Sequence, residues 1–199
     1  MANYTESIEK LIECLIKLPG IGRRSAERII GYVLNAPKEE VRLLSEAIYK
    51  VKENVVLCRI CNNLSEEELC KICQDSRRKA DTICIVENPS DVTAIEKAGN
   101  FEGTFHVLMG SISPLEGKGP ADLKIEGLLQ RIRQNNIKEI IIATDADTEG
   151  ETTAMYLTKL LKPLNVHITR IGVGLPVGSN LEYADSSTIA KSLESRRAI

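Results

Sequence analysis

Aromatic residues and long apolar runs are the two features that this sequence most clearly lacks. Phe, Trp and Tyr make up 4% of its 199 residues, and Trp is absent. Stacking of bases on an aromatic platform is therefore not expected to be its main way of binding nucleic acid. No apolar run approaches the roughly 20 residues that span a bilayer, which argues against a membrane-spanning helix.

The pattern of a secretory signal is also missing. The first residues, MANYTESIEKLIE, form an amphipathic and mildly acidic segment, whereas a signal peptide places a basic flank before an apolar stretch. We therefore expect a cytoplasmic protein. The composition, with 43% hydrophobic and 27% charged residues, is that of a globular protein with one medium domain or two small ones.

The chain has no overall excess of basic residues. Its formal net charge is −2, but residues 1–80 carry 14 Lys and Arg against 12 Asp and Glu, and residues 81–199 carry 12 against 16. Any contact with nucleic acid should therefore be local and lie in the first part of the chain. On charge alone, solvated faces explain the imbalance more simply.

Residues 1–57 have the pattern of an all-α segment. Apolar residues recur at helical spacing over 8–16, 26–34 and 41–51, the last stripe being Val41, Leu44, Ile48 and Val51. Helix-breaking residues separate the three stretches at Pro19-Gly20 and at Asn35-Ala36-Pro37.

From Thr82 the pattern changes to short apolar strands that alternate with helices. The strand-like stretches are TICIVE, TFHVLMG, EIIIATD and VHITRIGV, and the helical ones are SDVTAIEKAG, ADLKIEGLLQRIRQN, EGETTAMYLTKLL and SSTIAKSLESRR. This alternation predicts a mostly parallel sheet covered by helices on both faces. The expected fold class is α/β with an N-terminal all-α subdomain. Segments 110–120 and 172–180, rich in Gly, Pro and Ser, are the candidates for mobility.

The most specific local signal is a pair of cysteine turns, Cys58-x2-Cys61 and Cys70-x2-Cys73. Two such turns supply the four sulfur ligands of a tetrahedral zinc ion. Disulfides are the alternative, and a cytosolic location disfavours them. A redox role is disfavoured as well, because neither pair opens a helix after a strand. We expect one structural zinc ion per chain.

The remaining cysteines and the two histidines carry no such signal. Cys14 and Cys84 lie within apolar patterns and are expected to be core residues. His106 and His167 lie within expected strands and are interpreted as structural rather than catalytic.

The stretch LPGIGRRSAERII (18–30) predicts a helix that ends at Leu18, a tight turn, and a second helix that begins near Arg23. Gly20 and Gly22 would let a partner approach the backbone without a Cβ clash. Amide groups at the start of the second helix favour an anion, and three arginines add charge there: Arg23, Arg24 and Arg28. This arrangement fits a DNA phosphate and resembles a helix-hairpin-helix motif. The alternative is a plain turn between two helices with solvated arginines.

Binding through such a hairpin would hold the DNA backbone and read no bases, so it should be sequence-independent and sensitive to salt. One copy makes few phosphate contacts. Useful affinity therefore predicts several copies in an oligomer.

Three acids are expected at one edge of the predicted sheet. Glu87 ends the strand TICIVE, and Asp145 and Asp147 follow the strand EIIIAT. Ligands of alternating α/β domains gather beyond the carboxyl ends of the strands. A lone glutamate with an Asp-x-Asp pair resembles the Toprim domain of topoisomerases and primases, in which such acids bind magnesium.

The same acids also have a structural explanation, in which they stabilise the start of a helix instead of binding magnesium. Asp147 or Thr148 can cap the helix EGETTAMYLTKLL, in whose first turn Glu149 and Glu151 are favoured. Capping and metal binding can both hold at once.

Catalysis by these acids is disfavoured because the chain lacks the other motifs of topoisomerases and primases. A topoisomerase of this kind needs a nucleophilic tyrosine, and none of the five tyrosines stands in a recognisable motif. The topoisomerase version commonly has an arginine after the second Asp, where this chain has Thr148. Nothing resembles the nucleotide-binding apparatus of a primase.

The order of these motifs, together with particular stretches, resembles the bacterial recombination mediator family RecR. The stretches that carry the resemblance are LPGIGRRSAERI, VENPSDVTAIE, GSISPLEGKGP, EGETTAMYL and GLPVGSNLEYAD, and it covers essentially the whole chain. It implies four segments: a helix-hairpin-helix DNA-binding domain (1–57), a four-Cys zinc motif with its linker (58–80), a Toprim-like α/β domain (81–175), and a C-terminal tail and helix for inter-subunit contact (176–199).

The resemblance implies a protein that is not an enzyme. Family members form homotetrameric rings that clamp DNA, and with RecO and RecF they help RecA replace single-strand-binding protein at gaps. The Toprim face, around Glu87, Asp145, Asp147 and Glu149, is implied as a partner-docking surface. Many relatives replace part of the Asp-x-Asp pair, whereas this sequence keeps both acids, so a magnesium role stays open.

Two alternatives stand beside this hypothesis. One is a magnesium-dependent enzyme that acts on DNA phosphodiesters through the Toprim acids. The other is a zinc-based protein-interaction module with no role in DNA binding.

Overall fold

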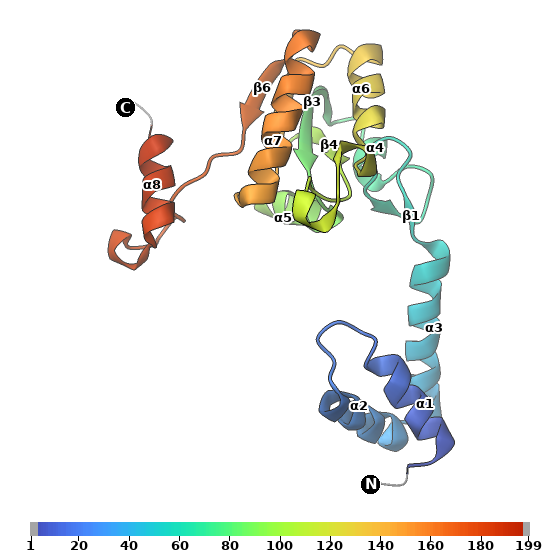
Figure 1. Ribbon diagram of the computed structural model, residues 1–199. Helices are drawn as coiled ribbons and strands as arrows, with labels where there is room; N and C mark the ends of the chain where they lie inside the picture. The colour runs from blue at the N-terminus through green and yellow to red at the C-terminus, as the bar shows by residue number, and fades with distance from the viewer. Residues whose placement is uncertain (1–3, 197–199) are drawn as a thin grey trace. The chain divides into compact units, whose positions relative to one another are not determined.

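The computed structural model describes residues 4–196 and divides the chain into two compact units, Met1–Val55 and Val56–Ile199 (Figure 1). The outer ends of the first and last expected segments, residues 1–3 and 197–199, lie outside the described residues. Over the described part of the chain, no helix combines the length and the apolar character needed to cross a membrane.

The first unit consists of three helices, α1 (Glu6–Leu15), α2 (Arg23–Asn35) and α3 (Lys38–Asn54). Its small core lies between α1 and α2, where Ile12, Ala26 and Ile30 are buried. Because residues three or four apart share one face of a helix, the apolar stripes at 8–15 and 26–30 meet across this core.

Two expectations for α1 are wrong. The helix ends at Leu15 rather than at Leu18, and a turn follows in which the Leu18 N–H donates to the Leu15 carbonyl at 3.0 Å. Cys14 is exposed rather than buried, because the buried side of α1 carries Ile12. Cys14 follows the charged Glu13 and lies off the stripe formed by Ile8, Ile12 and Leu15, so its place in an apolar stretch did not mean burial.

Helix α3 forms where the sequence predicts it, but its apolar stripe is not covered. Leu44, Ile48 and Val51 are 48%, 67% and 63% exposed, and no residue of α3 is buried. An exposed apolar stripe on a whole helix is unusual in a monomer and indicates an interaction surface.

The second unit is built on a four-stranded parallel sheet, as the sequence predicts. Its strands are β3 (Lys79–Val86), β4 (Gly103–Val107), β5 (Glu139–Ala143) and β6 (His167–Arg170), in the order β4-β3-β5-β6. Both histidines lie in strands, as expected: His106 is buried in β4, and His167 begins β6.

Alternate residues of β3 serve two separate cores. Ile83 and Ile85 face the side covered by α6 (Ile125–Gln134) and α7 (Thr148–Leu161). Cys84 and Val86 face the side covered by α5 (Pro89–Ala98). Successive side chains of a strand point to opposite faces, so a continuous apolar run is what a strand buried on both faces requires. The burial of Cys84 confirms its expected core position.

Short elements complete this unit. Cys58 and Cys61 lie on the turn between β1 (Val56–Leu57) and β2 (Leu64–Ser65). Cys70 is the N-cap residue of the short helix α4 (Lys71–Gln74), and Cys73 lies within that helix. The expectation that neither cysteine pair opens a helix after a strand is therefore wrong for Cys70 and Cys73, because α4 follows β2 in the chain. The tail carries α8 (Ser186–Glu194), where the sequence predicts a helix. The 3₁₀ turns are η1 (Pro114–Glu116), η2 (Pro120–Asp122), η3 (Lys162–Leu164) and η4 (Leu181–Tyr183).

Segment 110–120 is held by its own hydrogen bonds and by contacts to α7. Ser113 and Lys118 form a two-bond bridge at 3.0 and 2.9 Å. The Ile112 N–H donates to the Thr153 hydroxyl at 2.8 Å, and the Ser113 hydroxyl donates to Glu149. The loop therefore links the end of β4 to the start of α7.

The chain leaves β3 and β5 toward opposite faces of the sheet. Since α5 covers one face and α7 the other, the carboxyl ends of these neighbouring strands form the crevice in which α/β proteins place ligands. The loop after β5 passes so close to α7 that a Cβ at Gly150 would lie 2.2 Å from the backbone oxygen of Asp145. Only glycine fits at this position.

We predict that Gly150→Ala lowers the free energy of unfolding by roughly 2 kcal/mol or more, because the added carbon overlaps backbone that must then move. The control is Gly127→Ala in α6, where the added Cβ would meet its nearest atom at an ordinary 3.8 Å. Helix propensity predicts that this change stabilises by about 0.5–1 kcal/mol. Urea unfolding followed by circular dichroism measures both, and equal effects would contradict the assignment.

Candidate functional site

Three groups of residues carry chemistry: the hairpin between α1 and α2, the four cysteines, and the acids at the carboxyl end of the sheet. The structure supports each in a different way. The hairpin lies in the first unit and the other two groups in the second.

The hairpin leaves backbone open at both of its glycines. Gly20 has φ +77°, a left-handed conformation that favours glycine. Gly22 has an ordinary extended backbone, and a Cβ at either glycine would meet nothing within 4 Å. Among residues 4–196, nothing packs against the position that a side chain at residue 22 would occupy, so a partner can approach the backbone there.

The start of α2 presents amide groups without a side-chain cap. Gly22 is the N-cap residue, and no side chain accepts a hydrogen bond from the first turn. Free N–H groups and the helix dipole together form a site for an anion such as a phosphate.

The arginines expected at this end are not equivalent. Arg23 is paired with Glu9 at 3.2 Å and with Glu27 at 3.3 Å. Arg24 and Arg28 are exposed, and the described residues give neither an ion-pair partner. These two, four residues apart on one helix face, are better placed for phosphate than Arg23.

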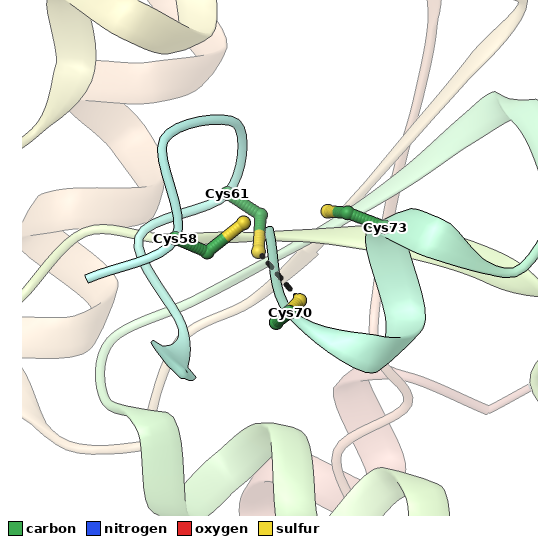
Figure 2. A group of neighbouring side chains, drawn as sticks. All are labelled: Cys58, Cys61, Cys70 and Cys73. Atoms are coloured by element: carbon green, nitrogen blue, oxygen red, sulfur yellow. Dashed lines mark hydrogen bonds between the residues drawn. The ribbon is translucent and has the colours of Figure 1, made fainter. Parts of the chain in front are cut away.

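The four cysteines come together although they stand on two separate turns. Figure 2 shows Cys58 and Cys61 on one side and Cys70 and Cys73 on the other, and all four sulfur atoms lie within 4.8 Å of one another. The Sγ atoms of Cys61 and Cys70 are 3.5 Å apart. A tetrahedral zinc ion, with zinc–sulfur bonds of about 2.3 Å, separates its sulfur ligands by about 3.8 Å.

The protonation of this cluster also suits a cation. Hydrogen bonding with Cys70 raises the pKa of Cys61 to about 12, and hydrogen bonding with Cys61 raises the pKa of Cys73. Thiols held this close share protons until a cation replaces them. The donor set, its burial and its spacing therefore fit zinc, which the fold uses to join two turns that have little apolar core of their own.

Glu87 is the buried member of the acidic edge. It follows β3 directly, is 5% exposed, and accepts a hydrogen bond from the Asp145 N–H at 3.1 Å. Burial, together with the nearby charges of Asp145 and Asp147, raises the pKa of Glu87 to about 7 against the lowering effect of that hydrogen bond. Near neutral pH this carboxyl group is therefore only partly charged.

Asp147 caps the N-terminus of α7, which is one of the two caps expected from the sequence. Its carboxylate accepts from the Gly150 N–H at 2.7 Å. Glu149 lies in the first turn and accepts from the Ser113 hydroxyl. The expected acids do share one edge, but among the described residues only the four cysteines gather three or more potential ligand atoms around one point.

Arg170 is a residue that reasoning from the sequence missed. Its guanidinium donates to the Thr144 hydroxyl at 2.6 Å, to the Asp145 carbonyl at 3.3 Å and to Glu151 at 2.9 Å. It thereby fixes the loop that carries the Asp-x-Asp pair. A lone arginine in the expected strand VHITRIGV was the available signal.

We predict that metal analysis finds one zinc ion per chain, and that Cys70→Ser abolishes its retention because three thiolates leave the tetrahedron incomplete. Cys14→Ser is the control, since Cys14 is exposed and outside the cluster. Metal-free protein with intact thiols would contradict the site.

We also predict that Glu87 makes stability fall as the pH rises. The folded state holds this proton up to about pH 7, whereas the ordinary pKa of a glutamate, which the unfolded chain has, is 4.5. The unfolded state binds fewer protons between these values, so Glu87 costs stability progressively over that window. Glu87→Gln should therefore be more stable than the unaltered protein at pH 8, by roughly 3 kcal/mol at most.

Thermal unfolding at several pH values measures this difference. Glu126→Gln is the matched control, because Glu126 is exposed in the first turn of α6. If Glu87→Gln and the unaltered protein show parallel pH profiles, Glu87 is not the buried acid described here.

Family models match almost the whole chain. They are the RecR helix-hairpin-helix (residues 8–52), the RecR four-cysteine zinc finger domain (55–75), the Toprim domain (81–172) and the RecR C-terminal segment (174–197). The zinc finger match contains all four clustered cysteines, which supports structural zinc.

Full-length relatives agree with these matches. The chain is 48% identical to "Recombination protein RecR" of Desulforudis audaxviator over 196 residues, covering 98% of this chain and 99% of the relative. It is 51% identical to the protein of the same name from Acidothermus cellulolyticus, with 98% of each covered. With that of Pelotomaculum thermopropionicum it shares 50% over 197 residues, or 99% of this chain and 98% of the relative. The chain therefore belongs to the RecR family of recombination proteins.

Proposed function

We propose that this chain is a DNA-binding recombination mediator that acts by holding DNA and recruiting partners, without changing DNA covalently. It works as an oligomeric clamp, a homotetrameric ring, and with RecO and RecF it helps load RecA at single-stranded gaps. Its location is the cytoplasm, on the nucleoid during repair. The observation that carries the proposal is the open hairpin at Gly20 and Gly22, in a chain of the RecR family.

The DNA contact is assigned to the hairpin and the first two turns of α2. Gly20 and Gly22 allow the DNA backbone to approach, uncapped amides bind a phosphate, and Arg24 and Arg28 supply exposed charge. Arg23 contributes less, because Glu9 and Glu27 already balance its charge. All of these contacts are to phosphate, so binding is independent of sequence.

Self-association is supported by two exposed apolar regions. One is the α3 stripe with Leu44, Ile48 and Val51. The other is the C-terminal tail, where Val177 and Tyr183 are exposed. Both kinds of surface are typical of subunit contacts. In a ring, several copies of the weakly binding hairpin contact phosphates of the same DNA molecule, which raises the overall affinity.

The zinc ligands are assigned as Cys58, Cys61, Cys70 and Cys73, with a structural role. The acidic edge is assigned to partner docking through Asp145, Asp147 and Glu149, and the buried Glu87 lies below them. Asp147 and Glu149 already accept hydrogen bonds from the chain itself, which supports a fixed surface rather than a reacting centre.

Magnesium-dependent chemistry on DNA phosphodiesters is the second candidate. The observation in its favour is Glu87, a buried acid whose pKa is raised to about 7 beside the retained Asp-x-Asp pair. A general acid or base works best at such a value. A magnesium ion there would instead hold Glu87 in its charged form and could bridge the acids to a phosphate without any bond being broken.

We predict that Arg24→Ala together with Arg28→Ala weakens DNA binding at unchanged helical content. The slope of log affinity against log salt should fall by about 1 for each phosphate that the variant no longer neutralises. Fluorescence anisotropy with labelled DNA at several salt concentrations measures this.

Arg42→Ala is the matched control, because Arg42 is also exposed in the first unit but is paired with Glu39 and Glu46. It should leave both affinity and salt slope unchanged. An unchanged slope in the double variant would move the DNA site elsewhere.

A further inference from the structure

The outer edge of β4 is where the cysteine turns join the sheet. β4 is the edge strand in the order β4-β3-β5-β6. The Val107 N–H donates to the Cys61 carbonyl at 2.8 Å, and the Asn62 side chain donates to the Val107 carbonyl at 3.2 Å. The backbone beside a predicted zinc ligand is therefore hydrogen-bonded directly to the sheet.

Arg131 contacts the same edge of β4, next to the cysteine turns. It reaches from α6, and its guanidinium donates to the Phe105 carbonyl and to the Thr104 hydroxyl, both at 2.6 Å. Both acceptors are neutral. Among the described residues no carboxylate pairs with Arg131, although its side chain is partly buried.

A cation removed from water without a negative partner is costly, so its charge must be balanced by something nearby. Arg131 and Cys73 line the same cavity of about 550 Å³, and no Asp or Glu of the described chain lines it. Burial lowers the pKa of Arg131, and the charges of the four cysteine sulfurs, Cys73 foremost, oppose that shift. Cys73, which shares this cavity, is a group that becomes negative when it holds a metal ion.

The zinc cluster has the charge to fill this role. Four thiolates around one Zn²⁺ carry a formal charge of −2, which a buried site must also balance. Arg59 is the other arginine on this cavity, but it is paired with Glu68 at 2.9 Å and its side chain is 70% exposed. Of the two arginines on this cavity, Arg131 is thus the one without a carboxylate partner.

We propose that the Arg131 guanidinium is the counter-charge of the zinc–thiolate cluster, so that retention of zinc depends on a positive charge at position 131. Arg131 is a positioning residue: it fastens α6 to the β4 edge and holds the charge beside the thiolates. The proposal rests on the four cysteines being the zinc ligands, and the zinc content of the unaltered protein tests that assignment separately.

The experiment measures zinc affinity by competition with a chelator of known affinity, together with the rate of zinc release into excess chelator. Arg131→Gln should lower affinity roughly tenfold or more, the range found when groups that support metal ligands are removed. Arg131→Lys keeps the charge and should stay near the unaltered protein. Arg133→Gln, an exposed arginine two residues further along α6, should have no effect.

Circular dichroism checks that each variant is folded. Equal zinc affinity of Arg131→Gln and the unaltered protein would overturn the proposal. So would an Arg131→Lys variant as weak as Arg131→Gln, since the hydrogen bonds rather than the charge would then matter. If Arg131→Gln does not fold, Arg131→Lys decides alone: retention near the unaltered level supports the counter-charge, and a tenfold loss rejects it.

Discussion

The second unit depends on covering the open edge of its sheet. An edge strand exposes a row of N–H and C=O groups that would otherwise pair with another chain. Here the backbone of Cys61 and the side chains of Asn62 and Arg131 satisfy the outer side of β4. The cysteine turns have little apolar core, so a metal ion must hold the shape that makes this cover possible. The metal site is therefore linked through the cysteine turns to the edge of the sheet.

The same sheet also brings acids together, at the crevice beyond the carboxyl ends of β3 and β5. There the acids are mostly occupied by structure: Asp147 caps α7, and Glu149 holds segment 110–120. Arg170 fixes the intervening loop from β6. A surface organised in this way presents charge in a constant arrangement, which suits recognition of a partner. Glu87, buried below it, is the one acid whose charge near neutral pH is still variable.

Much of the fold follows from local patterns. The strands of the sheet and the helices between them were predictable because a doubly buried strand must be apolar throughout and a covering helix must be amphipathic. The zinc motif was predictable because thiolate pairs at this spacing have few other uses. The cap by Asp147 was predictable from its place just before a helix.

Other features depend on contacts between distant parts of the chain. Arg131 meets the edge of β4 across 26 residues, and Ser113 meets Glu149 across 36. Arg170 gave only the faint signal of a charge within a strand. Cys14 was placed wrongly because it lies two positions after the buried Ile12 and therefore on another face of α1. The pairing of Arg23 with Glu9, which is our reason for proposing the DNA contact at Arg24 and Arg28, depends on how α1 and α2 pack.

The central claim is that the chain holds DNA and leaves its strands intact. The most direct measurement is a gel shift on end-labelled gapped DNA with magnesium, followed by denaturing electrophoresis of the same samples. The account predicts shifted complexes whose strands keep their full length and carry no protein. Cut strands, or strands covalently linked to protein, would show that the acids at the carboxyl end of the sheet are catalytic and would contradict it.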